Sequence, residues 1–158
     1  NLVTAIIASY VIFLFDATIE QLVALAVLMP IVASMGGNAG TQTLTVTVRA
    51  LATKDITYSN AWRFINKEML VALFNGVMFA LIISVASWVW FSNSGLSFVI
   101  FIAMIINMLA AGFSGIVIPL LLNKIGADPA LAATVFVTTV TDVIGFFAFL
   151  GLAAWVLI

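Results

Sequence analysis

The chain has 158 residues, of which 65% are hydrophobic and only 7% are charged, and its formal net charge is −1. Soluble domains carry about 25% charged residues, so the composition predicts an integral membrane protein, and the charge suggests no nucleic-acid partner. The chain has no cysteine and no histidine. Disulfides, thiolate metal sites, the usual zinc ligands and Ser–His catalysis are therefore excluded, and we expect no enzyme.

Two apolar runs open the chain. The first, residues 2–15, is short for a helix that needs about 20 residues to cross a bilayer, and an acidic turn with Asp16 and Glu20 follows it. The chain starts inside an apolar run without a charged segment or a cleavage site, so we expect it to be the membrane domain of a larger protein. The second run, residues 22–48, is long enough to span the membrane.

Small and polar residues interrupt the second run. After Pro30 come three glycines, which permit either close approach to a neighbouring helix or a local break. These glycines are Gly36, Gly37 and Gly40. Asn38 and Gln42 lie four residues apart, hence on one helical face, with Thr41 beside them. The segment is interpreted as a polar lining with helix-packing glycines; the alternative is a packing seam whose hydroxyls bond back to their own helix.

The third run covers residues 69–91. In the connection before it, residues 52–68, Arg63 and Lys67 lie four apart, which predicts an amphipathic or interfacial helix leading into the span. A fourth run covers residues 96–122. Asn75 and Asn107, one in each of these runs, are interpreted as helix–helix contacts rather than ligands.

Asp142 is the only charged residue of the fifth run, residues 130–158, and lies near its midpoint. A charge at the bilayer centre costs roughly 2.5–3.5 kcal/mol on insertion scales, so Asp142 is predicted to face water, a partner or an ion. The residues on its helical stripe are Thr134, Thr138, Thr141 and Gly145. A hydroxyl stripe around one carboxylate suits a hydrated cation; the alternative is an aspartate that the threonines hold in place by hydrogen bonds. The sequence thus predicts an all-α protein with five transmembrane helices.

Every cation of the chain lies between the second and third runs or between the fourth and fifth. They are Arg49, Lys54, Arg63, Lys67 and Lys124. By the positive-inside rule these two connections are cytoplasmic and the C-terminus is extracytoplasmic. We therefore expect a multi-pass protein of the inner (plasma) membrane, surrounded by the lipid bilayer.

Two stretches carry a resemblance to a known family. The first runs from Pro30 to Met35-Gly-Gly-Asn-Ala-Gly-Thr-Gln42, and the second from Asp128-Pro-Ala-Leu131 to Phe136-Val-Thr-Thr-Val-Thr-Asp142. On these motifs, essentially the whole chain resembles the membrane domain of the MgtE family of magnesium channels.

The resemblance implies a homodimer with the pore on its two-fold axis, lined by the second and fifth spans of both subunits. It implies Mg²⁺ as the transported and bound ion, Asp142 as the ion-selecting ligand, and Asn38, Thr41 and Gln42 in the pore-lining helix. It also implies that the full-length protein has cytoplasmic helical and CBS sensor domains, which are not part of residues 1–158.

Elementary chemistry agrees with this assignment. Mg²⁺ usually keeps several waters, with Mg–water at ~2.1 Å and water–carboxylate at ~2.7 Å, so two Asp142 carboxylates that hold a fully hydrated ion stand roughly 9–10 Å apart. Two alternatives stay open: a proton- or sodium-coupled carrier with Asp142 as the exchange site, and an assembly subunit in which Asp142 only joins helices. The chain lacks the paired inverted broken helices that many carriers show.

Overall fold

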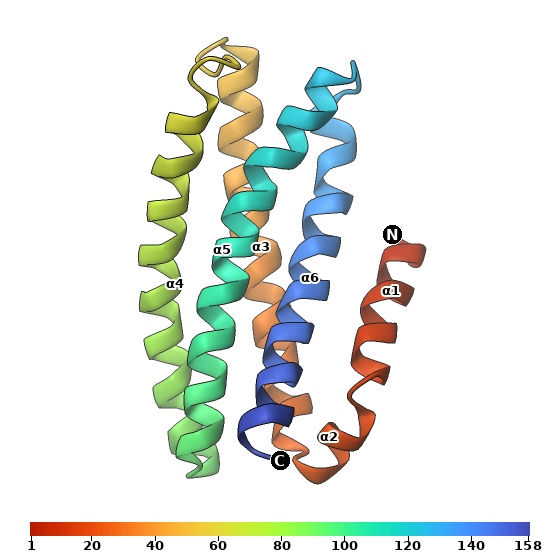
Figure 1. The fold of residues 1–158 in the computed structure, drawn as a ribbon, viewed down its shortest axis with the longest axis vertical. Coiled ribbons are helices and arrows are strands. Elements are labelled where there is room, and N and C mark those ends of the chain that lie inside the picture. Colours follow the sequence, from red (N-terminus) through yellow and green to blue (C-terminus); the bar gives the residue numbers. More distant parts are fainter.

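The long helices of the chain lie side by side and alternate in direction (Figure 1). In the computed structural model, which describes residues 1–158, four helices are long and apolar enough to cross a membrane. They are α3 (Ala24–Ala52), α4 (Ala61–Phe91), α5 (Ser94–Lys124) and α6 (Pro129–Val156). There is no strand, so the prediction of an all-α protein is confirmed.

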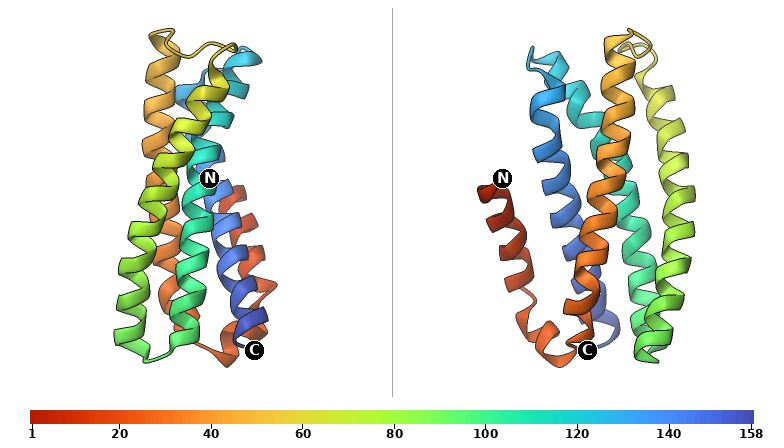
Figure 2. Two further views of the ribbon diagram at one scale, coloured as in Figure 1. Left: turned by 60° about the vertical axis from the view of Figure 1, so that its left-hand side comes forward. Right: turned by 180° about the vertical axis from the view of Figure 1, so that it is seen from behind.

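The N-terminal part of the chain forms two short helices. α1 (Leu2–Phe13) has 12 residues, and the predicted acidic turn is the helix α2 (Asp16–Gln21). α1 packs against α6 and covers only part of its length (Figures 1 and 2). At about 1.5 Å of rise per residue, α1 is shorter than the roughly 30 Å hydrocarbon core of a bilayer. The count of five spans therefore stays a prediction.

α5 is the central helix of the bundle. It packs against α3, α4 and α6, and it supplies deeply buried side chains such as Ile100, Met104 and Ile116. In contrast, α3 and α4 hardly touch each other, although both lie against α5. This arrangement leaves the side of α3 toward α5 packed and the side toward α4 open. The polar residues of α3 are therefore divided between these two sides.

Local sequence signals explain the helix ends. The Asn93 side chain accepts a hydrogen bond from the Leu96 N–H at 2.9 Å and begins α5, and Asp128 accepts one from the Ala130 N–H at 2.9 Å and begins α6. Pro129 occupies the first turn of α6, where its missing N–H leaves no hydrogen bond unmade. α3 continues without a break through Pro30 and its glycines, so close helix approach, not a broken helix, is the structural outcome.

The connection between α3 and α4 is shorter than the expected residues 52–68, because α4 begins at Ala61. Arg63 and Lys67 lie in the first turns of α4, so the helix expected to lead into the third span is present and is continuous with that span. The Asn60 side chain holds the turn before α4, because it accepts from the Thr57 N–H at 2.8 Å and donates to the Asp55 carbonyl at 2.9 Å. The connections α3–α4 and α5–α6 lie at the same end of the bundle (Figure 1), as the placing of the cations predicts.

Candidate functional site

Asp142 is half-buried in the middle of α6. The threonine hydroxyls around it donate to backbone carbonyls of their own helix instead of to its carboxylate. Thr138 donates to the Thr134 carbonyl at 3.0 Å and Thr141 to the Thr138 carbonyl at 3.0 Å. The alternative in which threonines hold Asp142 by hydrogen bonds is therefore not what the structure shows, and the carboxylate keeps its acceptor capacity.

The hydroxyl oxygens near Asp142 also keep acceptor capacity. Each back-bond uses the single donor of a threonine, and the oxygen lone pairs remain available. Thr134 is exposed and Thr138 is half-buried, so both oxygens can accept hydrogen bonds from water. Together with Asp142 they form a line of acceptors along α6 at a spacing of four residues. Such a line suits the waters of a hydrated cation.

Two members of the predicted stripe face the inside of the bundle. Thr141 is fully buried, and its methyl group would lie 3.5 Å from a Cβ at Gly40 of α3. Gly145 is buried against Asn107 of α5. Within the single chain both residues pack helices together, because a helix turns by about 100° per residue and so presents them to α3 and α5. Their place in a pore lining stays a prediction.

The three glycines of α3 fall into two environments. A Cβ at Gly40 would lie 2.6 Å from Val137 Cγ1 of α6, and one at Gly36 would overlap the Asn107 carboxamide. These two glycines are helix-packing residues, as the sequence predicts. Gly37 differs, since a Cβ there would meet nothing within 4 Å. Gly37 is turned about 100° from Gly36, so a side chain added there would have open space within its own chain.

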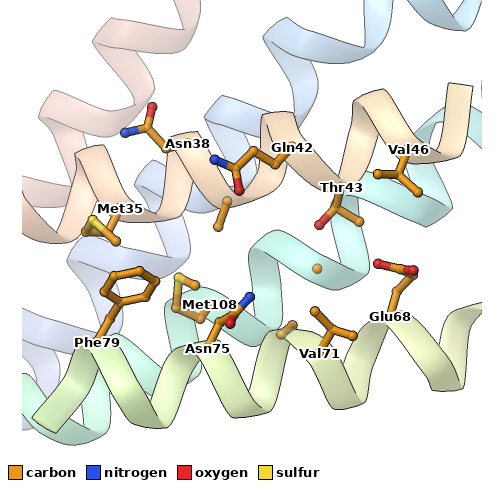
Figure 3. A pocket seen from close by; sticks show the side chains of 13 residues that line it. Met35, Asn38, Gln42, Thr43, Val46, Glu68, Val71, Asn75, Phe79 and Met108 are labelled. Carbon is orange, nitrogen blue, oxygen red and sulfur yellow. The ribbon is translucent and has the colours of Figure 1, made fainter. Parts of the chain in front are cut away.

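The polar residues of α3 are separated in the same way. Thr41 is half-buried and donates to the Gly37 carbonyl at 2.8 Å. Asn38 and Gln42 are exposed and line a groove of about 470 Å³ between α3 and α4, with α5 beneath it (Figure 3). Asp142 is not among the lining residues of this groove. The structure therefore does not bring Asn38 and Gln42 together with Asp142 within one chain, and their pore-lining role stays a prediction.

The groove also contains a carboxylate that the sequence pattern did not single out as part of a site. Glu68 of α4 points into it from the side opposite Thr43, and Asn75 lies two turns further along α4 (Figure 3). Glu68 is the last residue of the connection expected over residues 52–68, and the structure places it in α4. The i, i+7 spacing of Glu68 and Asn75 is the signal that would have placed both on one helical face.

The carboxylates of one chain are not clustered. No group of three or more Asp or Glu side chains that could hold a metal ion gathers anywhere in the structure. The chemistry that α6 presents is a single carboxylate with neutral oxygens beside it, which matches water-mediated rather than direct coordination of a hard cation.

Comparisons with known proteins agree on one family. The model of the family MgtE, described as divalent cation transporter, matches residues 29–152. The chain is 37% identical over 140 residues, 89% of its length, to the magnesium transporter MgtE of Enterococcus faecalis. It is 32% identical to the proteins of the same name from Bacillus subtilis, over 94% of the chain, and Thermus thermophilus, over 96%. The chain spans about a third of the length of these relatives: 33%, 31% and 34% for Bacillus, Enterococcus and Thermus.

Proposed function

Because the chain belongs to the MgtE family of divalent cation transporters, we propose that it is the ion-conducting membrane domain of a magnesium channel. The observation that carries the proposal is Asp142, a lone carboxylate at mid-span that is half-open and has no hydrogen-bond donor in its own chain. A charge at this depth needs a counterpart, and a divalent cation with its waters supplies one.

The proposed pore lies between two copies of the chain. A two-fold axis beside α6 pairs Asp142 with its copy, so two carboxylates face one hydrated Mg²⁺. Thr134 and Thr138 extend the acceptor line along α6, and Thr41 adds a hydroxyl from α3. Since Mg²⁺ dehydrates reluctantly, the residues bind its waters rather than the ion itself. A ring of two carboxylates in a narrow, low-dielectric path also favours cations over anions.

The continuity of α3 favours a channel over a coupled carrier. Many carriers bind their ions at discontinuous helices whose unwound backbone supplies carbonyl ligands. α3 has no such interruption despite Pro30 and its glycines, and its carbonyls stay within the helix. The proposed ion path is therefore lined by side chains.

The proposed orientation places the α3–α4 and α5–α6 connections in the cytoplasm. Both connections lie at one end of the bundle, so one accessibility experiment decides the orientation. The chain has no cysteine, so a single cysteine can be introduced at Asp55 or at Ser92 at the opposite end. A membrane-impermeant maleimide applied to intact cells should label only Ser92→Cys; labelling of Asp55→Cys alone would reverse the orientation.

Magnesium uptake by proteoliposomes tests the role of Asp142. Asp142→Asn keeps the shape of the side chain and removes its charge, and uptake should fall roughly 100-fold, because loss of a charged partner in a desolvated site costs about 2–5 kcal/mol. Asp128→Asn is the matched control: it removes a carboxylate from the same helix and keeps a good N-cap, so uptake should stay near the wild-type rate. Equal uptake by wild type and Asp142→Asn would refute the site.

A further inference from the structure

One side chain of the central helix contacts both proposed pore helices. Asn107 of α5 is fully buried, and its carboxamide fits between Gly36 of α3 and Gly145 of α6. A Cβ at Gly145 would lie 2.6 Å from Asn107 Nδ2 and 2.9 Å from its Cγ, and a Cβ at Gly36 would overlap the same group. Both helices are therefore in contact with one carboxamide, and each meets it at a position without a side chain.

The contact with α3 is also a hydrogen bond. Asn107 Nδ2 donates to the Val32 carbonyl at 2.8 Å. Val32 precedes Gly36 by four residues, so a side chain at position 36 would fill the space through which Nδ2 reaches that carbonyl. The bond fixes both the height and the rotation of α3 relative to α5, because the carbonyl of one particular residue must face Asn107.

The contact with α6 acts on Asp142 through the helix backbone. Gly145 follows Asp142 by three residues, less than one helical turn. When Gly145 is seated against Asn107, the direction in which Asp142 leaves the helix is fixed. The same carboxamide therefore sets the position of the polar segment of α3 and the direction of the Asp142 carboxylate on α6.

The hydrogen bonding of the Asn107 carboxamide is incomplete. Its Nδ2 has a partner, but its Oδ1 is buried and has none. A buried acceptor without a donor destabilises by an amount similar to what one hydrogen bond adds, so the two effects offset each other. Hydrogen bonding therefore adds little net stability at Asn107, and the contribution of its carboxamide is the packing between α3 and α6.

From this geometry, and building on the proposed function above, we propose that Asn107 is a positioning residue that sets the spacing and rotation of α3 and α6 and thereby the ion discrimination at Asp142. Two facing carboxylates that hold a hydrated ion through its waters accept only a narrow range of separations. Ca²⁺ binds its oxygens at longer distances and with looser geometry than Mg²⁺. A shift of α6 therefore changes the binding of the two ions to different extents.

The variant Asn107→Ala tests the proposal in the full-length protein. It removes the wedge between α3 and α6 and the bond to Val32, and the ratio of Mg²⁺ to Ca²⁺ uptake should fall roughly tenfold. Asn75→Ala is the matched control, because Asn75 is a half-buried asparagine of α4 that lines the groove and leaves the α3–α6 contact untouched. Its uptake ratio should equal that of the wild type.

A compensating pair makes the test specific to this contact. Gly145→Ala alone should lose most uptake, since its new Cβ would overlap Asn107. In the double variant Asn107→Ala with Gly145→Ala, the added methyl has the space that the carboxamide left, so uptake should recover in part. If the loss of uptake in the double variant equals the sum of the losses in the two single variants, the contact does not set the geometry and the proposal is wrong.

A distance measurement separates this proposal from the proposed function. Spin labels on cysteines introduced at Thr45 of α3 and Phe136 of α6, both exposed, report the α3–α6 distance when labelled chains are diluted with unlabelled ones. Asn107→Ala should shift or broaden the distance distribution, and Asn75→Ala should not. Wild-type distances and a wild-type uptake ratio in Asn107→Ala would overturn the proposal. Altered distances in Asn107→Ala, with Asp142→Asn still conducting, would refute the pore at Asp142 and leave only the spacing of α3 and α6 to Asn107.

Discussion

α3 meets its neighbours in two contrasting ways. Toward α5 and α6 its small residues allow near-contact of backbones; a Cβ at Gly115 of α5 would lie 2.8 Å from the Gly40 carbonyl. Toward α4 it stays apart, and amide and carboxylate side chains line the groove between the two helices (Figure 3). One side of α3 is packed against other helices, and the other side is open to the groove.

The contrast follows from how helices associate in lipid. Without a hydrophobic driving force between them, helices are held by van der Waals contacts and a few hydrogen bonds, and both increase when small residues let backbones approach. Large polar side chains prevent such approach and need water or a partner. The packed seam of α3, α5 and α6 therefore determines where Asp142 lies, while the groove leaves α4 more weakly connected to α3.

The largest effect is expected when an added side chain prevents the close approach of α3 and α6. Gly40→Val places a branched side chain where even a Cβ would lie 2.6 Å from Val137. Overpacking of this kind costs about 1–3 kcal/mol and more when rigid helices must separate, so the variant should unfold at lower temperature and lose magnesium uptake. Thermal unfolding in detergent, followed by circular dichroism, measures the change.

Gly37→Val is the matched comparison for folding. It makes the same substitution three residues earlier in the same helix, where a Cβ meets nothing within 4 Å. Its unfolding temperature should stay close to that of the wild type. Equal destabilisation by the two variants would show that helix propensity rather than the seam decides stability.

An intermediate effect should separate the two sides of α6. Thr138→Val replaces a half-buried hydroxyl on the Asp142 line, and magnesium uptake should fall roughly fivefold, because about one net hydrogen bond to the hydrated ion is lost. Thr141→Val replaces a fully buried hydroxyl that bonds only to the Thr138 carbonyl, and uptake should change less than about twofold. Equal losses in proteoliposome uptake would mean that Thr141 also faces the ions.

The smallest effect is expected in the groove. Gln42→Leu keeps most of the side-chain volume and removes the amide from a groove that does not contain Asp142. Uptake should change by less than about twofold, since surface substitutions away from a site usually alter energies by under about 0.5 kcal/mol. A loss as large as that of Thr138→Val would place Gln42 on the ion path.

Much of this arrangement is readable from the sequence. The apolar runs predict the long helices, and the interpretation of Asn107 as a helix–helix contact is confirmed by its bond to Val32. Local signals are sufficient for the spans, because a span depends on residues that are close in the chain.

The division of α3 into a packed and an open side is not readable in this way. Spacing shows that Asn38 and Gln42 share a face, and that Gly36 and Gly40 share another, but it does not show which neighbour each face meets. That depends on α5 lying between α3 and α4, a fact of the tertiary arrangement. For the same reason the stripe of α6 appeared uniform, although Thr141 and Gly145 pack inside the bundle and Thr134 and Thr138 do not.

The most direct test of the proposed channel is the recording of unitary currents from the protein in planar bilayers with Mg²⁺ as the only permeant cation. We expect currents that reverse at the magnesium equilibrium potential, that proton and sodium gradients leave unchanged, and that disappear in Asp142→Asn. Currents of normal size in Asp142→Asn would contradict the role of the carboxylate, and magnesium transport that requires a proton or sodium gradient would identify a coupled carrier instead.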